Sequence, residues 1–247
     1  MPTYIVRPLP TFRTLFPHKM IMTYFVDGGP VWGTSHMFYI EGSAKHIIID
    51  ASSRYEVEVK RLPPGFKAEP VMSPEDALAS VGLKPKDIDV VILTHLHQDH
   101  VSNISAFTNA EIYVQEDELN FARAPHPFWS VMYPKENVEK IMRMKLRVIR
   151  GDYQIDESIK ILMTPGHTPG TQSVQVETSA GPAIIAGFCC IEENFEPPAP
   201  MKATGIEVIP PGILTDLIQA YDSALKIKEQ AKIIIPSHGN RLPKKIP

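Results

Sequence analysis

The chain has 247 residues, of which 25 are Lys or Arg and 28 are Asp or Glu, so its formal net charge is −3. With 43% hydrophobic and 21% charged residues, the composition is that of a folded globular protein and excludes a disordered chain. A slightly acidic chain has no electrostatic attraction for nucleic acid or an anionic membrane, so we expect neither as a partner. We expect a single domain over residues 1–247.

The cysteine content and the apolar runs indicate a cytoplasmic protein. Cys189 and Cys190 are adjacent, which is a poor geometry for a disulfide. A reducing compartment therefore fits the cysteine content better than an oxidising one. The N-terminus lacks the charged start and the long apolar stretch of a signal peptide. The longest apolar runs, 90–93 and 233–235, are far shorter than the roughly 20 residues that span a bilayer. We therefore expect a cytoplasmic protein without a membrane segment.

Short apolar runs alternate with helix-like segments along the chain, which predicts an α/β fold. Buried strands are predicted at 47–49, 89–93, 112–114, 159–163, 174–176 and 233–235. Helices are predicted at 73–82, 116–123, 136–145 and 214–228. In the first of these helices Ser73 is a good N-cap, Pro74 fits the first turn, and Gly82 is expected to close the helix.

Two segments have the composition of long loops, 61–66 and 124–133. The second carries aromatic residues between prolines, and it is expected to form either a substrate wall or an oligomer contact. A homodimer is therefore a possible assembly. Among the histidines outside the motifs described below, His36 and His126 are candidates to face a cleft.

The stretch Thr94-His95-Leu96-His97-Gln98-Asp99-His100 follows an apolar strand that ends at Leu93. Residues two apart on extended chain face the same side, so His95 and His97 can bind one metal ion. Asp99 and His100 come where the chain turns, and they can point at a second ion. Three imidazoles and a carboxylate within six residues suit a divalent cation such as zinc.

Two further histidines each follow a predicted strand. His167 lies in Pro165-Gly166-His167-Thr168-Pro169-Gly170, directly after the strand 159–163. His238 lies in Pro236-Ser237-His238-Gly239, directly after the strand 233–235. Each imidazole is thus placed at the C-terminal end of a buried strand, where a rigid scaffold presents functional side chains.

In this order, H-x-H-x-D-H, P-G-H-T-P-G and P-S-H-G resemble the metal-ligand series of the metallo-β-lactamase superfamily, over nearly the whole chain from residue 47 to 239. The resemblance implies a four-layer αβ/βα sandwich with metals at one edge. It implies a first metal held by His95, His97 and His167, and a second held by Asp99, His100 and His238. Asp50 resembles the aspartate that supports the ligand loop of the family from behind.

The sequence departs from the family pattern at the residue that bridges the two metals. Most binuclear members carry an aspartate on a strand shortly after P-G-H-T-P-G, whereas the corresponding predicted strand 183–191 holds no carboxylate. By register, Phe188 or Cys189 occupies that place. A cysteine fills it in one group of β-lactamases, so we expect Cys189 to be a thiolate ligand. The alternative is that both cysteines are small core hydrophobes, with Cys190 on the opposite face of a regular strand.

Within the superfamily the chain is most similar to the N-acyl homoserine lactonase group, in 165–173 and in Glu193-Asn194-Phe195-Glu196. The resemblance implies a zinc-dependent hydrolase with two ions per chain, iron and manganese being the other candidate ions. It implies a metal-bound hydroxide that opens a lactone, with Asp99 as ligand and proton shuttle.

The small-molecule substrate is less defined than the metal site. Those lactonases often use a tyrosine just after the bridging aspartate, and none stands there in this sequence. Candidates for the missing contact are Tyr24, Tyr39, Trp129 and Tyr133. Alternative functions are a glyoxalase II-like thioesterase, another amide or β-lactam hydrolase of the same fold, or a non-catalytic metal-binding scaffold.

Overall fold

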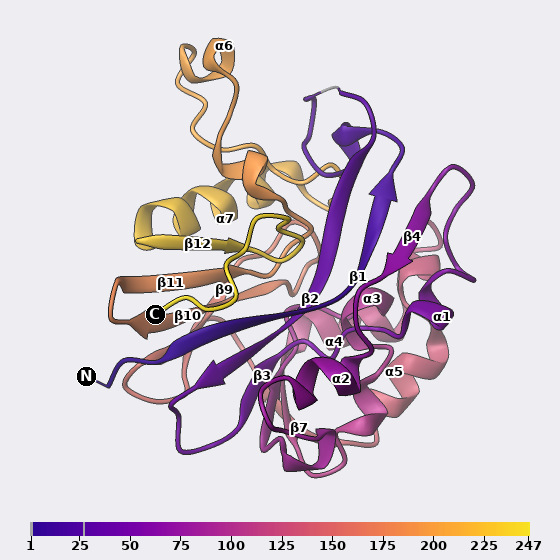
Figure 1. The fold of residues 1–247 in the computed structure, drawn as a ribbon. Helices are drawn as coiled ribbons and strands as arrows, with labels where there is room; N and C mark the ends of the chain where they lie inside the picture. Colours follow the sequence, from indigo (N-terminus) through magenta and orange to yellow (C-terminus); the bar gives the residue numbers. More distant parts are fainter. Residues whose placement is uncertain (1, 27) are drawn as a thin grey trace.

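Figure 1 shows the computed structural model, which describes residues 2–26 and 28–247 as two β-sheets with helices on their outer faces. The first sheet has seven strands in the order β4-β1-β2-β3-β5-β6-β7. Strands β3, β5, β6 and β7 run parallel, and β1 pairs antiparallel with β2 and β4. Their bounds are β1 Ile5–Phe16, β2 Val31–Glu41, β3 Ile47–Ile49, β4 Lys67–Pro70, β5 Val90–Ile92, β6 Glu111–Gln115 and β7 Lys145–Ile149.

The second sheet has five strands in the order β12-β11-β10-β9-β8. Its strands pair antiparallel, except for the parallel pair β11 and β12. Their bounds are β8 Tyr153–Gln154, β9 Ile159–Met163, β10 Gln172–Thr178, β11 Gly181–Ala186 and β12 Ile233–Pro236.

The helices lie in the connections between the strands. The α-helices are α1 Tyr55–Glu58, α2 Pro74–Ala79, α3 Gln98–Val101, α4 Glu116–Arg123, α5 Lys135–Ile141, α6 Ala199–Lys202 and α7 Leu217–Gln230. The short 3-10 helices are η1 Lys19–Ile21, η2 Pro85–Asp87, η3 Ile104–Ala106, η4 Ser130–Met132 and η5 Glu192–Phe195. Among the described residues, no helix combines the length and the apolar character that crossing a membrane requires.

The core is divided into layers by the alternation of side chains along each strand. Ile47 and Ile49 of β3 pack between the two sheets, whereas Ile48 packs among helices α2, α4 and α5. On the second sheet, Ile185 faces the first sheet, and Ile184 packs under α7. The layers are therefore helix, sheet, sheet and helix, which confirms the αβ/βα sandwich (Figure 1).

Several predicted elements differ from the structure. The predicted helix 136–145 ends at Ile141, because residues 145–149 instead pair with β6 as the edge strand β7. The predicted strand 183–191 is wrong beyond Ala186, where β11 ends and an irregular segment carries both cysteines. Strands β1 and β2 lie outside the predicted elements. Pro8 and Pro10 make β1 hard to recognise in the sequence, because proline lacks the N–H that pairs strands. The pairing of β1 with β2 shifts after Pro10.

The remaining helices agree with their predictions except near the ends. Helix α4 has the predicted bounds, and α7 begins three residues later than predicted, after the N-cap Asp216. Helix α2 begins after the N-cap Ser73 and ends at Ala79, with Gly82 at a φ of +79° beyond it.

The three ligand segments follow the C-terminal ends of β5, β9 and β12, so one edge of the sandwich carries all of them.

Candidate metal centre

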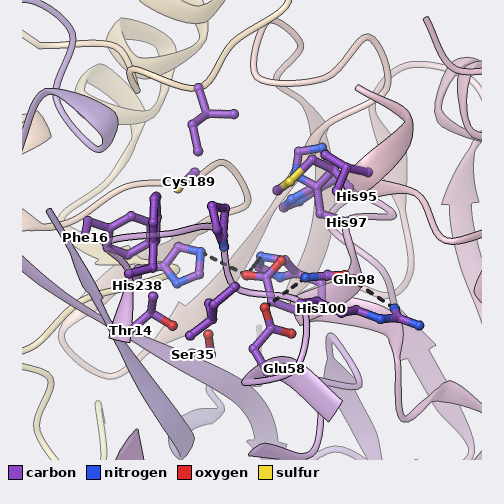
Figure 2. Close-up of a pocket in the computed structure, with 18 of the residues that line it drawn as sticks. Thr14, Phe16, Ser35, Glu58, His95, His97, Gln98, His100, Cys189 and His238 are labelled. Carbon is purple, nitrogen blue, oxygen red and sulfur yellow. Dashed lines mark hydrogen bonds and ion pairs between the residues drawn. The ribbon is translucent and has the colours of Figure 1, made fainter. Parts of the chain in front are cut away.

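Six of the predicted ligands gather into two adjacent groups (Figure 2). The ligand atoms within each group lie within 4.8 Å of one another. Every one of the five histidines is at most 4% exposed. The first group is His95, His97 and His167, and the second is Asp99, His100 and His238. The structure thus brings together the two ligand sets that the resemblance implies.

The Nε2 atoms of the first group lack the hydrogen bonds to oxygen that buried polar atoms normally make. Nε2 of His97 is buried without a hydrogen-bond partner among the described residues. Nε2 of His95 and Nε2 of His167 face each other at 3.2 Å. Burial lowers the pKa of His95 and His97 well below the usual range, and lowers that of His167 to about 4. Neutral, converging nitrogens with free lone pairs fit a metal ion.

The second group contains a carboxylate and differs in charge from the first. Oδ2 of Asp99 lies 3.3 Å from Nε2 of His100 and 3.6 Å from Nε2 of His238. Burial opposes ionisation of Asp99, but the facing His100 outweighs it and lowers the pKa of this carboxyl. Burial lowers the pKa of His238 to about 3. An ionised carboxylate beside two imidazoles is a ligand set for a divalent cation.

Asp50 fixes the ligand loop 94–100 through hydrogen bonds to its carboxylate. Its carboxylate accepts hydrogen bonds from the Thr94 backbone N–H at 2.8 Å, from the Thr94 hydroxyl and from His100 Nδ1 at 2.7 Å. Burial disfavours the protonated His100, but Asp99 and Asp50 outweigh it and raise the pKa of this imidazole. Asp50 has a φ of +61°, a strained conformation for a residue with a Cβ. The strained turn directs this carboxylate toward Nδ1 of His100. The other ring nitrogen, Nε2, then points toward Asp99 within the second group.

A second buried carboxylate, Glu118 of α4, connects the two ligand loops. One oxygen accepts from the Leu96 backbone N–H at 2.9 Å and from the Tyr133 hydroxyl at 3.0 Å. The other accepts from the Thr168 hydroxyl and from the Gly170 N–H at 3.2 Å. A Cβ on Gly170 would lie 2.2 Å from the Glu118 backbone nitrogen, so only glycine permits this approach. Local sequence does not reveal this role, because acids are common in the first turn of a helix.

A cavity of about 150 Å³ lies over both ligand groups. Both predicted loops contribute apolar side chains to its wall, which confirms that the loop 124–133 borders the cavity. The apolar lining residues are Phe16, Leu62, Pro63, Phe66, Val131, Met132 and Ile213. Phe128 and Val131 of the second loop are 75% and 65% exposed, and an oligomer contact through them stays a prediction.

Cys189 lines this cavity, whereas its neighbours do not (Figure 2). Phe188 and Cys190 pack into the outer core under α7. The Cys189 sulfur lies 3.4 Å from the sulfur of Met22 and belongs to neither group of converging ligand atoms. Burial raises the pKa of the Cys189 thiol, and the charge of Asp99 adds to this. Either Phe188 or Cys189 was expected at the place of the bridging aspartate, and Cys189 is the one that lies beside the candidate metal centre. Its role as a ligand stays a prediction.

The residues proposed for the missing tyrosine contact lie outside the cavity wall. The Tyr133 hydroxyl donates to Glu118, and its ring packs edge-on against His97 at 4.9 Å. Trp129 stacks on the same imidazole at 6.5 Å. The Tyr39 hydroxyl lies 3.2 Å from Nδ1 of His46. Tyr24 packs against an exposed phenylalanine next to it. Two of the four therefore support His97 rather than the substrate.

The remaining candidate histidines do not reach the cavity either. His36 is buried within β2, where its Nδ1 lies 3.3 Å from the Ser237 carbonyl oxygen, so it supports the turn that carries His238. His36 therefore does not face the cavity, contrary to the expectation. His126 is exposed in the loop 124–133 and does not line the cavity.

Five polar residues of the cavity wall were absent from the predicted site, and three of them form one cluster: Glu58, Arg61 and Gln98. Gln98 donates through Nε2 to Glu58 Oε1 at 3.0 Å and accepts through Oε1 from Arg61 at 3.4 Å. Burial raises the pKa of Glu58 to about 7, and the charge of Asp99 adds to the effect. Their separation in sequence hides this cluster, since only folding brings α1 beside the ligand loop.

Two adjacent ligand groups at the edge of an αβ/βα sandwich, beneath one cavity, define a metal-dependent enzyme. Residues 30–238 match the model of the metallo-beta-lactamase superfamily, and the chain belongs to that superfamily.

Characterised relatives indicate the kind of reaction. An N-acyl homoserine lactonase from Bacillus sp is 31% identical over 81% of this chain and 82% of that protein. A crystal structure of a B. thuringiensis AiiA variant with bound N-decanoyl-L-homoserine has a TM-score of 0.76 and 25% identity, covering 97% of this chain and 95% of that one. An N-acyl homoserine lactone hydrolase, with N-hexanoyl-L-homoserine at its catalytic metal centre, has a TM-score of 0.75, 25% identity and the same coverage. This chain is a lactonase-like, metal-dependent hydrolase.

The hydrogen bonds of Glu118 predict the effect of a single substitution. Glu118→Gln replaces one acceptor oxygen by an NH₂ group that faces N–H and O–H donors. We expect the free energy of unfolding to fall by about 2–4 kcal/mol, because buried donors lose their partner. Urea unfolding measures this. The exposed neighbour Asp117→Asn is the matched control and should stay within about 0.5 kcal/mol. Equal stability of the two variants would contradict the role of Glu118.

The lowered histidine pKa values predict that acid destabilises the metal-free protein. His36, His167 and His238 have pKa values of about 4, 4 and 3, below the ordinary value of about 6.5 in an unfolded chain. Below pH 6.5 the unfolded chain therefore binds protons that the folded chain does not. Each imidazole then lowers the free energy of unfolding by about 1.4 kcal/mol per pH unit. These imidazoles outnumber the two buried carboxyls with raised pKa, which act in the opposite sense.

The measurement is the urea midpoint of the metal-free protein between about pH 6.5 and pH 5. The midpoint should fall steadily as the pH is lowered across this window. Toward the acid end of this range the raised pKa of His100 contributes a nearly constant amount, since that histidine is then protonated in both states. A midpoint that is flat or rises toward pH 5 would contradict the prediction.

Proposed function

We propose that this protein is a zinc-dependent lactonase that uses two zinc ions per chain to open a cyclic ester. The observation that carries the proposal is that both ligand groups lie beneath one cavity with largely apolar walls. A small carbonyl compound with an apolar body fits such a cavity. The relatives that bind N-acyl homoserine products support a lactone as the substrate.

The ligand sets assign a place to each ion. His95, His97 and His167 would hold one ion, and Asp99, His100 and His238 the other. Imidazole and carboxylate ligands suit zinc, and iron or manganese binds similar sets, so metal analysis of the purified protein decides the identity. When bound, two such ions polarise a carbonyl group and supply hydroxide at neutral pH.

The residues of the chain perform the remaining steps. The apolar walls bind the body of the substrate and exclude water from it. Asp99 lines the cavity beside both ligand groups, and this position makes it the candidate to transfer a proton to the ring oxygen that leaves. Asp50 keeps His100 oriented, and Glu118 holds the two ligand loops at a fixed position relative to each other.

The structure favours a lactone over the thioester of an anionic thiol carrier. Such a carrier needs free cationic side chains near the site. Arg61 is the only Lys or Arg among the described residues that line the cavity, and it already pairs with Glu136 and Gln98. A thioesterase of the glyoxalase II type therefore lacks its recognition group at this cavity.

A proton-release assay tests the proposed reaction. Zinc-loaded protein should hydrolyse γ-butyrolactones that bear an alkyl or acyl chain, faster than thioesters, cyclic amides or β-lactams. His97→Ala should abolish turnover while circular dichroism shows a folded chain, because His97 is a ligand of the first group. His126→Ala is the matched control, since His126 is exposed outside the cavity. Full activity in the His97 variant would refute the metal-dependent mechanism.

The adjacent cysteines allow a separate test of the second metal site. We propose that the Cys189 thiolate binds the second ion when it is present, since zinc deprotonates a coordinating thiol. Cys189→Ala should then lower the metal content toward one ion per chain, whereas Cys190→Ala, in the outer core, should leave it unchanged. Elemental analysis after dialysis measures both. Equal metal content in the two variants would show that Cys189 is not a ligand.

A further inference from the structure

One end of the cavity is polar, and the metal ligands do not account for it. Glu58, at the C-terminal end of α1, lines the cavity beside Gln98 (Figure 2). Its side chain is 5% exposed. Glu58 belongs to neither group of converging ligand atoms. A buried carboxyl at the wall of a substrate cavity therefore needs a different explanation.

The hydrogen bonds around Gln98 leave one oxygen of Glu58 without a partner. Gln98 Nε2 donates to Glu58 Oε1 at 3.0 Å, and Gln98 Oε1 accepts from Arg61 Nη1 at 3.4 Å. The other end of the Arg61 guanidinium pairs with Glu136. These contacts fix which way the Gln98 amide points. Glu58 Oε2 is buried and has no hydrogen-bond partner among the described residues.

A buried carboxyl oxygen without a partner destabilises the folded chain, and native proteins rarely retain one. The cost is removed if a bound molecule supplies the missing hydrogen. We propose that Glu58 is a specificity-determining residue: in the ionised carboxylate, Oε2 accepts a hydrogen bond from an N–H or O–H group next to the ester of the substrate. This inference rests on the proposed lactonase function of the same cavity.

The proposal makes Glu58→Gln an informative substitution. Gln98 Nε2 still donates to the new amide oxygen, so the new NH₂ group must stand where Oε2 stood. A donor then faces the donor of the substrate. The neighbouring Gln98 therefore turns a nearly isosteric change into a reversal of hydrogen-bonding character at one atom.

The experiment compares matched lactones that differ in one donor hydrogen. One pair is α-hydroxy-γ-butyrolactone and its methyl ether, and the other is an α-acylamino-γ-butyrolactone and its N-methyl derivative. In Glu58→Gln we expect KM for the donor-bearing lactones to rise about tenfold, or ~1.4 kcal/mol, with kcat little changed. KM for the methylated partners should change less than about threefold. An equal change within each pair overturns the proposal.

Two further variants guard against a structural effect. Glu56→Gln, on the exposed side of α1, removes the same charge and should leave every KM unchanged. Glu58→Asp keeps the carboxylate but shortens it by one methylene, and it should also weaken only the donor-bearing lactones. Thermal melting checks that all three variants fold. If Glu58→Gln does not fold, Glu58→Asp decides the proposal by the same pairwise comparison.

A binding measurement separates this inference from the lactonase proposal. If the wild-type protein hydrolyses no lactone, the proposed function fails, and the dissociation constants of the ring-opened hydroxy acids are measured by calorimetry instead. Tighter wild-type binding of the donor-bearing acid, lost in Glu58→Gln, supports the role of Glu58. Dissociation constants that are equal within each pair overturn it.

Discussion

Four hydrogen-bond donors converge on the buried carboxylate of Glu118, and the geometry of the metal centre depends on them. The ligand loop 94–100 follows β5 of the first sheet, and the loop 164–170 follows β9 of the second. Because Glu118 accepts from both loops, it connects the two sheets at the edge where the ligands meet. Burial of a carboxylate is costly, so its full set of partners is what makes this connection stable.

The two ligand groups are supported in different ways, which gives them different chemistry. The first consists of three imidazoles that burial keeps neutral. In the second, Asp99 and Asp50 face His100 from opposite ring nitrogens. Carboxylate charge is therefore concentrated around the second group. An ion in the first group would be held by nitrogen ligands, whereas an ion in the second would also be balanced by carboxylate charge.

The cavity above the metal centre is asymmetric, and this bears on substrate choice. Apolar side chains from β1, from the loop 61–66 and from the loop 124–133 form one part of its wall. Glu58, Gln98 and Arg61 form a polar end beside the second group. An apolar wall binds many substrates with little discrimination, whereas a buried hydrogen-bonding group rejects those that cannot pair with it. Selectivity in this enzyme would therefore reside at the polar end.

The strands and helices that could be predicted are those whose signals are local. The triple isoleucine of β3 and the capped start of α2 lie within a few residues, so their elements are recognisable. Strand β1 is hidden by its prolines, which it tolerates beside a shift in its pairing with β2. The segment 136–145 is helical in pattern throughout, yet pairing with β6 converts its end into β7. Pairing between distant segments overrides local preference there.

From the sequence alone came the αβ/βα fold and six candidate ligands in two groups, because the strand-end motifs are local and specific enough to carry the resemblance to the superfamily that implies them. Tertiary structure decided the rest. It placed Cys189 rather than Phe188 at the cavity, since the strand ends before both. It also brought Glu118 between the ligand loops and Glu58 beside Gln98. These partners are 22 to 52 residues apart, and no local pattern specifies which buried acid meets which donor.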